Sequence, residues 1–533
     1  MVLRNGIFRI PTVFTIFKTI SITRKVTLIP RAAIFRFVRT NMTATLRVPA
    51  NAVKSMPKKT DLFYGGAWHK PKDEGSYAPT FNPATGEPIA YVAIASKEDT
   101  EDAVAAAKAA FPAWKATPPE KRAEILRKAA TIVRAHTHDL AMLDAANAGN
   151  PIKEMVDDVI FAADTMDYFA GLIPMIRGDT IPQREGFHYT IREPLGVVAR
   201  LVAYNHPILF SAEKIAAPLA AGNCVIIKPA EQAPLSALRL AEILQDVFPP
   251  GVLSFVPGGL ESGKVLGTHP DVKMVTLVGS VPTGKAILRG SADTLKPVLL
   301  ELGGKNPLVA YPDANIDKLV DGVVRGMNFA WASQSCGSMS RVFLHESHHD
   351  EVLEKAITRI RNEYVPGDPT DYKTTMGPVI NKTAFDRTAG YVKGAIAEGA
   401  KLILGGKRPD NVPEGSFFYE PTIFDGVTHD MTIAREEIFG PVLSVFTWKD
   451  EEDLWRIVND TNYGLTGSVF TENISIAQKA VERFEAGYVW VNNVALHYLG
   501  MPFGGYKNSG LGRDECFDEM ISCTQVKSVN VRL

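Results

Sequence analysis

Between residues 197 and 301, short apolar runs of strand length alternate with longer segments whose apolar residues recur at helical spacing. The expected strands cover residues 197–203, 224–228, 253–256, 274–278 and 297–300. The expected helices cover residues 207–221, 234–247 and 282–289. This order predicts an α/β fold with a doubly wound parallel sheet. Ligands of such folds bind at the carboxyl ends of the strands, where Lys228, Gly279, Ser280 and Glu301 stand.

A second alternating unit, from residue 306 to about 499, predicts a second α/β domain. Ahead of the first unit, Ser96 and Asp99 form a capping-box pattern that predicts the start of a helix. An extended stretch at 175–193 is expected to form a hairpin that leaves the body. Residues 524–533 alternate at a period of two, which predicts a strand without a local partner that pairs elsewhere, for example with another subunit.

Charge is distributed unevenly along the chain. Residues 1–60 contain twelve Lys or Arg and no Asp or Glu, which leaves 46 basic against 59 acidic residues in the remainder. This acidic body argues against a nucleic-acid surface. At 533 residues, the chain is long enough for two or three domains.

The first 40 residues combine eight basic residues with Ser, Thr and apolar residues, which is typical of a mitochondrial transit peptide. Arg9 and Lys18 interrupt the apolar run well short of the ~20 residues of a membrane span, so no span is expected. We expect a protein of the mitochondrial matrix. The alternative is a cytoplasmic form that starts at Met42, and a linker is expected at 41–60.

Four cysteines, Cys224, Cys336, Cys516 and Cys523, include no Cys-x-x-Cys pair, and no residues have the spacing of metal ligands. We expect free thiols and no metal site. Cys336 follows a mostly apolar run, where a lone cysteine is most often a buried small hydrophobe. Glu301 stands 35 positions earlier, between an apolar strand and a Gly-Gly turn. A thiol nucleophile and a carboxylate base together would serve two-step acyl chemistry.

Two strand ends carry features of a dinucleotide site. Residues from Gly279 to Gly284 connect a strand to a helix, where backbone N–H groups can hold a phosphate; a plain turn is the alternative, because the Gly-x-Gly-x-x-Gly fingerprint is missing. Glu231, close behind Lys228, could accept hydrogen bonds from ribose hydroxyls and repel a 2′-phosphate, which favours NAD over NADP. The alternative is that Lys228 and Glu231 are a solvated surface pair.

From about residue 61 to 533, the chain resembles the aldehyde dehydrogenase superfamily, whose NAD(P)-dependent members oxidise aldehydes to acids. The resemblance rests on motifs that begin at Asn205, Lys228, Gly279, Glu301, Gln334, Glu436 and Pro502. It implies an NAD-binding domain at 61–174 and 197–302, a catalytic domain at 303–500, and oligomerisation elements at 175–196 and 501–533 of a homodimer or homotetramer.

The resemblance also implies a role for each matched residue. Cys336 would be the nucleophile, Asn205 would form the oxyanion hole with the Cys336 backbone N–H, and Glu301 would activate the hydrolytic water. Cofactor contacts would come from Lys228 and Glu231 at the adenine ribose, Ser280 at the pyrophosphate, and Glu437 and Phe439 at the nicotinamide end.

Three positions depart from the family pattern: His206 replaces an aromatic residue, Glu213 replaces an apolar or aromatic one, and Ser333 replaces a glycine. His206 and Glu213 are spaced to share one helix face and, with His497 and Phe503, are expected to contact the substrate. This indicates an aromatic or polar aldehyde. The alternative for Glu213 is an ion pair with a neighbouring lysine.

Two other functions remain open at this stage. A coenzyme A-acylating relative would pass the thioester to CoA and would not need Glu301 as a water-activating base. An NAD-binding structural protein without catalysis would leave Cys336 inert. The presence of both residues favours the hydrolytic aldehyde dehydrogenase.

Overall fold

The computed structural model describes residues 45–532, so the predicted transit peptide and Met42 lie outside the described residues. Residues 45–60, most of the predicted linker, pack against the body. Ala52 is fully buried, and the Ser55 hydroxyl donates to Asp139 Oδ1 at 2.9 Å.

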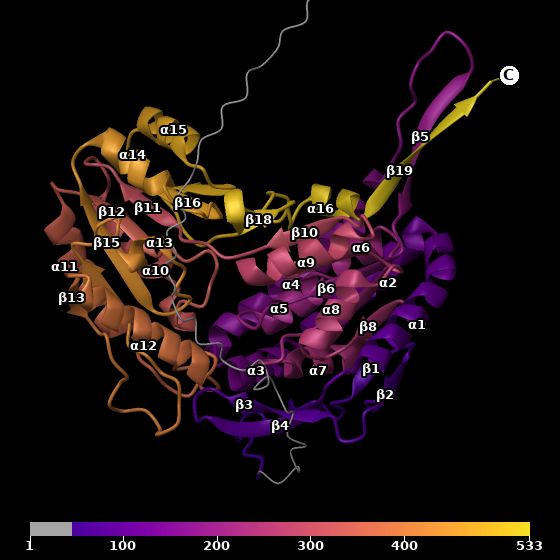
Figure 1. Cartoon of the computed structure of the whole chain (residues 1–533), viewed down its shortest axis with the longest axis horizontal. Coiled ribbons are helices and arrows are strands. Elements are labelled where there is room, and N and C mark those ends of the chain that lie inside the picture. The colour runs from indigo at the N-terminus through magenta and orange to yellow at the C-terminus, as the bar shows by residue number, and fades with distance from the viewer. Residues whose placement is uncertain (1–44, 533) are drawn as a thin grey trace, which may run out of the picture. The chain divides into compact units, whose positions relative to one another are not determined.

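The first sheet has eight strands in the order β18-β10-β9-β6-β7-β8-β1-β2 (Figure 1). Its parallel centre consists of β10 (Val298–Glu301), β9 (Val272–Val278), β6 (Val197–Leu201), β7 (Cys224–Lys228) and β8 (Leu253–Phe255). Antiparallel edges are β18 (Gly510–Leu511) on one side and β1 (Leu62–Tyr64) with β2 (Ala67–His69) on the other. The chain proceeds outward from β6 to β8 and resumes beyond β6 with β9. The strand order therefore reverses between β6 and β9, which confirms the doubly wound sheet.

Two groups of helices accompany this sheet. One group is in mutual contact and contains α2 (Pro119–Ala135), α3 (Thr137–Ala148), α4 (Ile152–Leu172), α5 (Pro207–Glu213), α6 (Ala216–Ala220) and α7 (Leu235–Leu244). The other contains α1 (Lys97–Ala116), α8 (Leu260–Thr268) and α9 (Val281–Ala292). Because parallel crossovers are right-handed, the reversal between β6 and β9 puts the two groups on opposite faces. The predicted capping box opens α1, with Ser96 Oγ accepting from the Asp99 N–H at 3.1 Å.

The predicted helix at 207–221 is two helices in the structure. It breaks between α5 and α6, around Lys214. Pro218 explains the break, because a proline has no N–H for the carbonyl four residues earlier, which is that of Lys214.

The second sheet has seven strands in the order β13-β14-β15-β12-β11-β16-β17. The bounds are β13 (Lys401–Leu404), β14 (Thr422–Asp425), β15 (Val442–Trp448), β12 (Arg341–His345), β11 (Pro307–Ala310), β16 (Thr466–Phe470) and β17 (Tyr488–Val491). Successive β11 residues face two separate cores: Leu308 and Ala310 pack in one, and Val309 in the other. This alternation is the period of two of a strand buried on both faces, and it confirms the second α/β domain.

The helices around this sheet divide between its two cores. Residues of α10 (Ile316–Gly326) and α11 (His349–Glu363) pack in the core that contains Leu308. The other core receives residues of α12 (Lys382–Ala397), α13 (Thr432–Arg435), α14 (Glu451–Asn459) and α15 (Ile474–Arg483).

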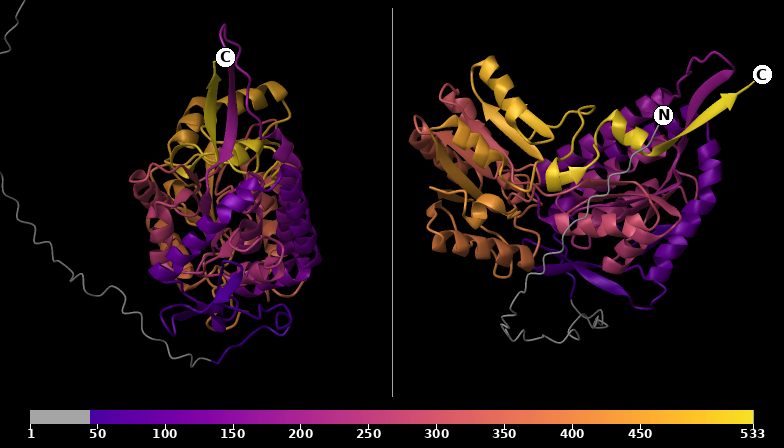
Figure 2. Two further views of the ribbon diagram at one scale, coloured as in Figure 1. Left: turned by 90° about the vertical axis from the view of Figure 1, so that its right-hand side faces the viewer. Right: turned by 45° about the horizontal axis from the view of Figure 1, so that its top comes forward.

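Two short antiparallel pairs complete the fold: β3 (Tyr77–Asn82) with β4 (Glu87–Ala93), and β5 (Phe187–Pro194) with β19 (Thr524–Val531). Figures 1 and 2 agree that β5 and β19 lie side by side and project from the neighbouring elements. The terminal strand therefore pairs with a distant segment of its own chain. Within 175–193, Thr180 and Tyr189 form an isolated bridge, so the predicted hairpin is only a short one.

Residues 501–523 differ from the predicted oligomerisation element. β18 joins the first sheet, and Met520 of α16 (Phe517–Ser522) belongs to the core of that sheet. Only the strand after α16 projects with β5.

Candidate active site

A cavity of about 530 Å³ opens at the carboxyl ends of β6, β9 and β10, where the strand order reverses. Its lining includes most of the residues predicted from sequence to react or to hold the cofactor: Asn205, Lys228, Glu231, Gly279, Ser280, Glu301, Cys336, Glu437 and Phe439. Residues far apart in the sequence therefore meet in one space. The sulfur at 336 and the carboxyl at 301 share this space with the turn at 279–283.

Lys228 and Glu231 stand at the end of β7 and line the cavity. Burial lowers the pKa of Lys228, and the described residues include no ion pair between Lys228 and Glu231. A Cβ placed on Gly259 would lie 3.5 Å from Glu231 Oε1, so this carboxylate extends over the Gly259 backbone. Lys228 is thus partly buried and Glu231 is exposed, and the two do not form an ion pair with each other.

Ser280 is the N-cap of α9 and lines the cavity, so the amino end of a twelve-residue helix faces the space. Helix N-termini favour anions, and this end suits a phosphate. Gly284 does not line the cavity: its N–H donates to the Ser280 carbonyl at 2.9 Å, and a Cβ there would lie 2.7 Å from Leu302 Cδ1. The structure therefore gives no support for cofactor binding by Gly284. This glycine allows α9 to pack closely against the chain after β10.

Cys336 follows a tight turn and is half-buried, whereas the other three cysteines are buried. The turn contains the short helix Phe329–Trp331 and two non-glycine residues with positive φ after it, Ala332 and Ser333. Burial raises the pKa of the Cys336 thiol to about 12, and the charges of Glu437 and Glu301 add to the effect. The thiol is thus protonated at neutral pH when the cavity holds no compensating positive charge.

Glu301 ends β10 and lies against Gly504, where a Cβ would come 2.8 Å from Glu301 Oε1. Its carboxyl is 5% exposed, and neither oxygen has a hydrogen-bond partner among residues 45–532. Burial raises the pKa of Glu301 well above its ordinary value, as does the charge of Asp514, while Lys214 counteracts both. A buried carboxyl without partners can take a proton from a molecule that enters the cavity.

Asn205 is buried, and its backbone carbonyl accepts from Asn150 Nδ2 at 2.7 Å. Its side-chain amide has no protein partner in the described part of the chain and is free to donate into the cavity. Glu437 Oε1 accepts from the Gly304 N–H at 3.0 Å, and burial raises the pKa of Glu437 to about 7. Phe439 has a positive φ of 53° and lines the same end of the cavity.

Sequence reasoning missed Arg387, which lines the cavity from α12 and donates to the Phe439 carbonyl at 3.4 Å. It also interacts with Tyr204, another lining residue. Arginine suits phosphate groups, so Arg387 could hold part of a pyrophosphate. No local signal marks it, because it follows the pattern of a solvated residue on an amphipathic helix.

His206 and Glu213 do not share a helix face as predicted. His206 is the N-cap of α5, outside the helix, and its Nδ1 lies 2.8 Å from Asp158 Oδ2. Glu213 is 3% exposed and pairs with Lys214 Nζ at 2.8 Å. The prediction of a shared helix face is wrong because α5 begins one residue after His206. The alternative prediction for Glu213, an ion pair with a neighbouring lysine, agrees with the structure. Neither residue lines the cavity described above.

His497 and Phe503 lie together, with ring centroids 4.6 Å apart. His497 Nδ1 is 3.0 Å from Glu515 Oε2. Phe503 is buried in a cluster against which Cys336 packs. Neither His497 nor Phe503 lines the cavity.

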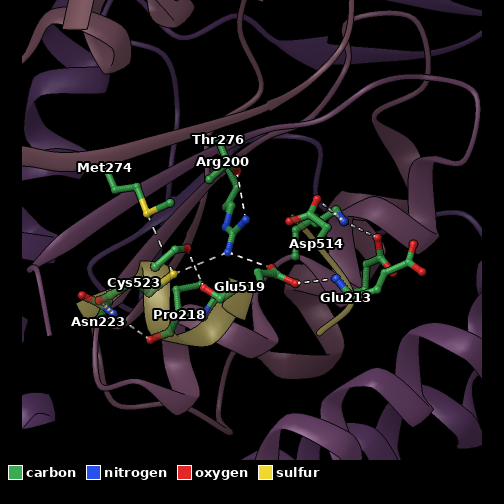
Figure 3. Close-up of polar contacts among 12 residues, drawn as sticks. Arg200, Glu213, Pro218, Asn223, Met274, Thr276, Asp514, Glu519 and Cys523 are labelled. Atoms are coloured by element: carbon green, nitrogen blue, oxygen red, sulfur yellow. Dashed lines mark hydrogen bonds and ion pairs between the residues drawn. The ribbon is translucent and has the colours of Figure 1, made fainter. Parts of the chain in front are cut away.

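A buried network of charges connects the first sheet to the segment after β18. Figure 3 shows Arg200 of β6 reaching Glu519 and Cys523, with Nη2 3.1 Å from Glu519 Oε1. Lys214 Nζ lies 2.8 Å from both Glu213 Oε1 and Asp514 Oδ2. These pairs bring fixed charges close to Glu301, whose pKa responds to Asp514 and Lys214.

Within residues 45–532, no group of three or more His, Cys, Asp or Glu side chains could hold a metal ion, and no helix is long and apolar enough to cross a membrane.

Comparison with known sequences agrees with this geometry. A sequence model of the aldehyde dehydrogenase family matches residues 68–529. The chain belongs to the aldehyde dehydrogenase family.

Individual relatives give the degree of similarity. The chain is 53% identical over 488 residues to aldehyde dehydrogenase tropH of Talaromyces stipitatus, covering 90% of this chain and 95% of that protein. It is 39% identical to betaine aldehyde dehydrogenase of Rhizobium etli, covering 90% and 98% of the two chains. The fold matches a structure of aldehyde dehydrogenase from Bacillus cereus in complex with NAD⁺, with a TM-score of 0.87 at 36% identity, covering 92% of this chain and 99% of that one.

Proposed function

We propose that the protein oxidises an aldehyde to a carboxylic acid with NAD as the cofactor. The observation that carries the proposal is that Cys336 and Glu301 line the same cavity as Lys228, Glu231 and Ser280. Reacting groups and phosphate- and ribose-binding groups thus share one space. The NAD⁺ bound by the similar Bacillus cereus enzyme supports the choice of cofactor.

In the proposed reaction, the Cys336 thiol first releases its proton to solvent, which the positive charge of a bound nicotinamide ring would favour. The thiolate then adds to the aldehyde carbon and forms a thiohemiacetal, while the Asn205 amide and the Cys336 N–H stabilise the oxyanion. A bound NAD would supply the acceptor for the hydride that this carbon loses. The remaining thioester is hydrolysed by water, whose proton Glu301 takes, and the acid leaves as the thiolate is restored. Lys228, Glu231, Ser280, Glu437, Phe439 and Arg387 would hold the cofactor.

Two variants test the assignment of the two reacting groups. Cys336→Ser should lose NADH formation with every aldehyde, because a serine hydroxyl beside carboxylates is a far weaker nucleophile. Glu301→Gln should retain a burst of one NADH per site and lose steady-state turnover. Stopped-flow absorbance of NADH measures both. Turnover by Cys336→Ser, or an undiminished steady state in Glu301→Gln, would exclude the corresponding role.

The same assay separates the two alternative functions. A hydrolytic enzyme forms acid without coenzyme A, so a requirement for CoA would favour the acylating alternative. Absence of NADH formation with every aldehyde tried, despite NAD binding, would favour the non-catalytic alternative. The buried carboxylate without partners at 301 favours hydrolysis, because thioester transfer to CoA needs no such base.

For the substrate, we propose an aromatic or polar aldehyde. The rings of Trp331 and Phe210 near His206, and of Phe503 near His497, support this class. Glu213 does not support a polar substrate, because its carboxylate is buried and paired with Lys214.

We further propose a homo-oligomer, a dimer or tetramer, in which the projecting β5–β19 pair contacts another copy. Partly exposed apolar side chains on this pair, Phe187, Ile191 and Val526, support the proposal. We also propose that residues 1–40 direct the protein to the mitochondrial matrix, on the composition argument alone. A fluorescent fusion of residues 1–40 that stays in the cytoplasm would contradict this.

A further inference from the structure

Two buried asparagine side chains hold the backbone of the two residues that the proposed function places around the oxyanion. Asn150 Nδ2 donates to the Asn205 carbonyl at 2.7 Å, and Asn306 Nδ2 donates to the Cys336 carbonyl at 2.6 Å. Both asparagines are 1% exposed, whereas Asn205 and Cys336 line the cavity and the two asparagines do not. The two amides therefore contact the reacting residues from within the protein, where a substrate does not reach.

The segment that carries Asn205 has little else to fix its backbone. Within residues 45–532, no backbone–backbone hydrogen bond reaches residues 203–205, which lie between β6 and α5. The Asn205 carbonyl accepts from Asn150 alone in that part of the chain. Because a peptide group is planar, a carbonyl held in place limits rotation about the Cα of its own residue. Asn150 therefore restricts the direction in which the Asn205 side chain points.

Asn150 itself stands in a short, stiff connection between α3 and α4. Gly149 ends α3 in the left-handed conformation, with a φ of 84°, and Pro151 has its φ fixed by its ring. One turn before the end of α3, Asp144 accepts from the Ile208 N–H of α5 at 2.8 Å. The carboxyl end of α3 thus holds the segment between β6 and α5 at two points.

Asn306 fastens the turn that contains Cys336 to the second sheet. Its Nδ2 also donates to the Ser338 carbonyl at 2.9 Å, and its Oδ1 accepts from the Thr466 N–H at 3.1 Å, at the start of β16. A Cβ placed on Gly304 would lie 2.6 Å from the Cys336 carbonyl oxygen, so this oxygen lies close against the backbone that leads into β11. Both ends of the Asn306 amide therefore hold the turn against β16.

We propose that Asn150 and Asn306 are positioning residues for the reaction: Asn150 orients the Asn205 amide, and Asn306 fixes the backbone that carries the Cys336 sulfur. A donor stabilises an oxyanion only where it already points at the developing charge, and a displacement of about 1 Å can cost about a hundredfold in rate. This inference rests on the proposed function and adds the groups that keep its geometry.

The first experiment is a double-variant cycle on the rate constant of NADH formation in the first turnover. Stopped-flow absorbance measures it at saturating NAD, with the aldehyde that the wild type oxidises fastest. Asn150→Ala should lower this rate constant about tenfold. In the Asn205→Ala background, Asn150→Ala should change it by less than about twofold, because the amide that Asn150 orients is then missing. The Kd of NADH, from its fluorescence, should stay within about twofold in Asn150→Ala, since Asn150 does not line the cavity.

The second experiment applies Asn306→Ala in the same two backgrounds. It should lower the rate constant about tenfold in the wild type and by a similar factor in Asn205→Ala, because Cys336 is the nucleophile in both. The two asparagines are thereby assigned to different residues: the effect of Asn150→Ala depends on Asn205, and that of Asn306→Ala does not. Loss of the Asn306→Ala effect in the Asn205→Ala background would contradict its assignment to Cys336.

Asn223→Ala is the matched control. Asn223 is fully buried, and its Nδ2 donates to two backbone carbonyls, at 3.0 and 3.1 Å. It directly precedes β7, at the amino end of the parallel strands, whereas the cavity opens at their carboxyl ends. Asn223→Ala should leave the first-turnover rate constant within about twofold. A tenfold loss in this control would show that removal of any buried amide has the same effect, and would overturn the inference.

The remaining outcomes separate the inference from the function on which it rests. If the wild type oxidises no aldehyde, or if Asn205→Ala reacts as fast as the wild type, the proposed roles fail and the inference fails with them. If Asn205→Ala is slow and Asn150→Ala is not, only the inference fails. An equal fractional loss from Asn150→Ala in both backgrounds would indicate a structural role and overturn it.

Isosteric variants cover the case in which an alanine variant does not fold. Asn150→Asp and Asn306→Asp keep the size of the side chain and lack the N–H donor, and Asn306→Asp also keeps an acceptor for the Thr466 N–H. The same cycle applies to them. Failure of both Asn150 variants to fold, beside a folded Asn223→Ala, would show that Asn150 serves the fold and would overturn the inference.

Discussion

Ser333 adopts the left-handed backbone conformation in the turn before Cys336, with a φ of 56°. The side chain is 2% exposed, and its hydroxyl has no partner within the described chain. A residue with a Cβ is strained at such a φ, and a buried hydroxyl without a partner adds a desolvation cost. Ser333, in the turn that leads to Cys336, therefore carries backbone strain that a glycine would avoid.

We expect Ser333→Gly to raise the free energy of unfolding by about 1 kcal/mol, because relief of the left-handed strain exceeds the added entropy of the unfolded chain. Guanidinium titration measures the change. Ser333→Ala is the control, since it removes the hydroxyl and keeps the Cβ. An equal gain in both variants would assign the cost to the hydroxyl instead of the backbone.

Glu301 makes stability depend on pH. Because its pKa is raised in the folded protein, the folded state keeps a proton that the unfolded state loses above the ordinary value of 4.5. Its contribution to stability therefore falls as pH rises from that value toward the raised pKa. A group placed for proton transfer is thus a source of instability at neutral and basic pH.

Glu301→Gln stays neutral and should be more stable than the wild type at about pH 8, with the difference shrinking toward about pH 4.5. Melting temperatures across this range give the comparison, and the exposed Glu231→Gln serves as control. A difference between Glu301→Gln and the wild type that does not change with pH would refute this account.

At the scale of elements, α16 is fastened to the first sheet by a buried ion pair. Arg200 is fully buried and Glu519 is 2% exposed, and Arg200 Nη1 also donates to Thr276 Oγ1 at 3.1 Å. Nearby, Lys214 joins α5's end to Asp514. These contacts hold the segment after β18 against β6 and β9, and thereby the Gly504 backbone against Glu301.

Arg200→Leu should destabilise the protein by about 3–5 kcal/mol, because it leaves the Glu519 carboxylate buried without its partner. Thermal unfolding at neutral pH measures the loss. The double variant Arg200→Leu with Glu519→Leu should recover part of it, since no buried charge then remains unpaired. A double variant that is worse by the sum of both single losses would contradict this explanation.

At the scale of the whole molecule, β5 and β19 pair over eight residues, from Thr524 opposite Pro194 to Val531 opposite Phe187, and project from the neighbouring elements (Figure 2). A two-stranded pair is marginally stable in water by itself, and its free edges can add further strands. A projecting pair with exposed apolar side chains is consistent with the proposed contact to another copy.

Deleting residues 524–533 should reduce the oligomer to a smaller species, because it removes the strand that completes the projecting pair. Light scattering coupled to size-exclusion chromatography gives the mass of both chains. An unchanged subunit number would show that other surfaces hold the assembly.

Periodicity and spacing in the sequence predict much of the fold and the site. The central strands of the first sheet agree with the predicted runs, and Cys336, Glu301 and Asn205 line one cavity as their motifs indicated. The predictions that differ from the structure do so for physical reasons. Pro218 divides a helix whose apolar pattern is continuous, and Gly284 serves packing where a phosphate contact was expected. Arg387 has a local pattern like that of any solvated helix residue.

The sequence alone determined which segments form strands and helices and which chemical groups stand at their ends, because backbone preferences and side-chain periodicity act over neighbouring residues. Only the tertiary structure decided which side chains and which strands pair with each other. His206 binds Asp158, 48 positions away, and β19 pairs with β5 across more than half the chain. Such partners depend on which elements pack together, and the free energy of that packing is spread over the whole core, so no local pattern encodes it.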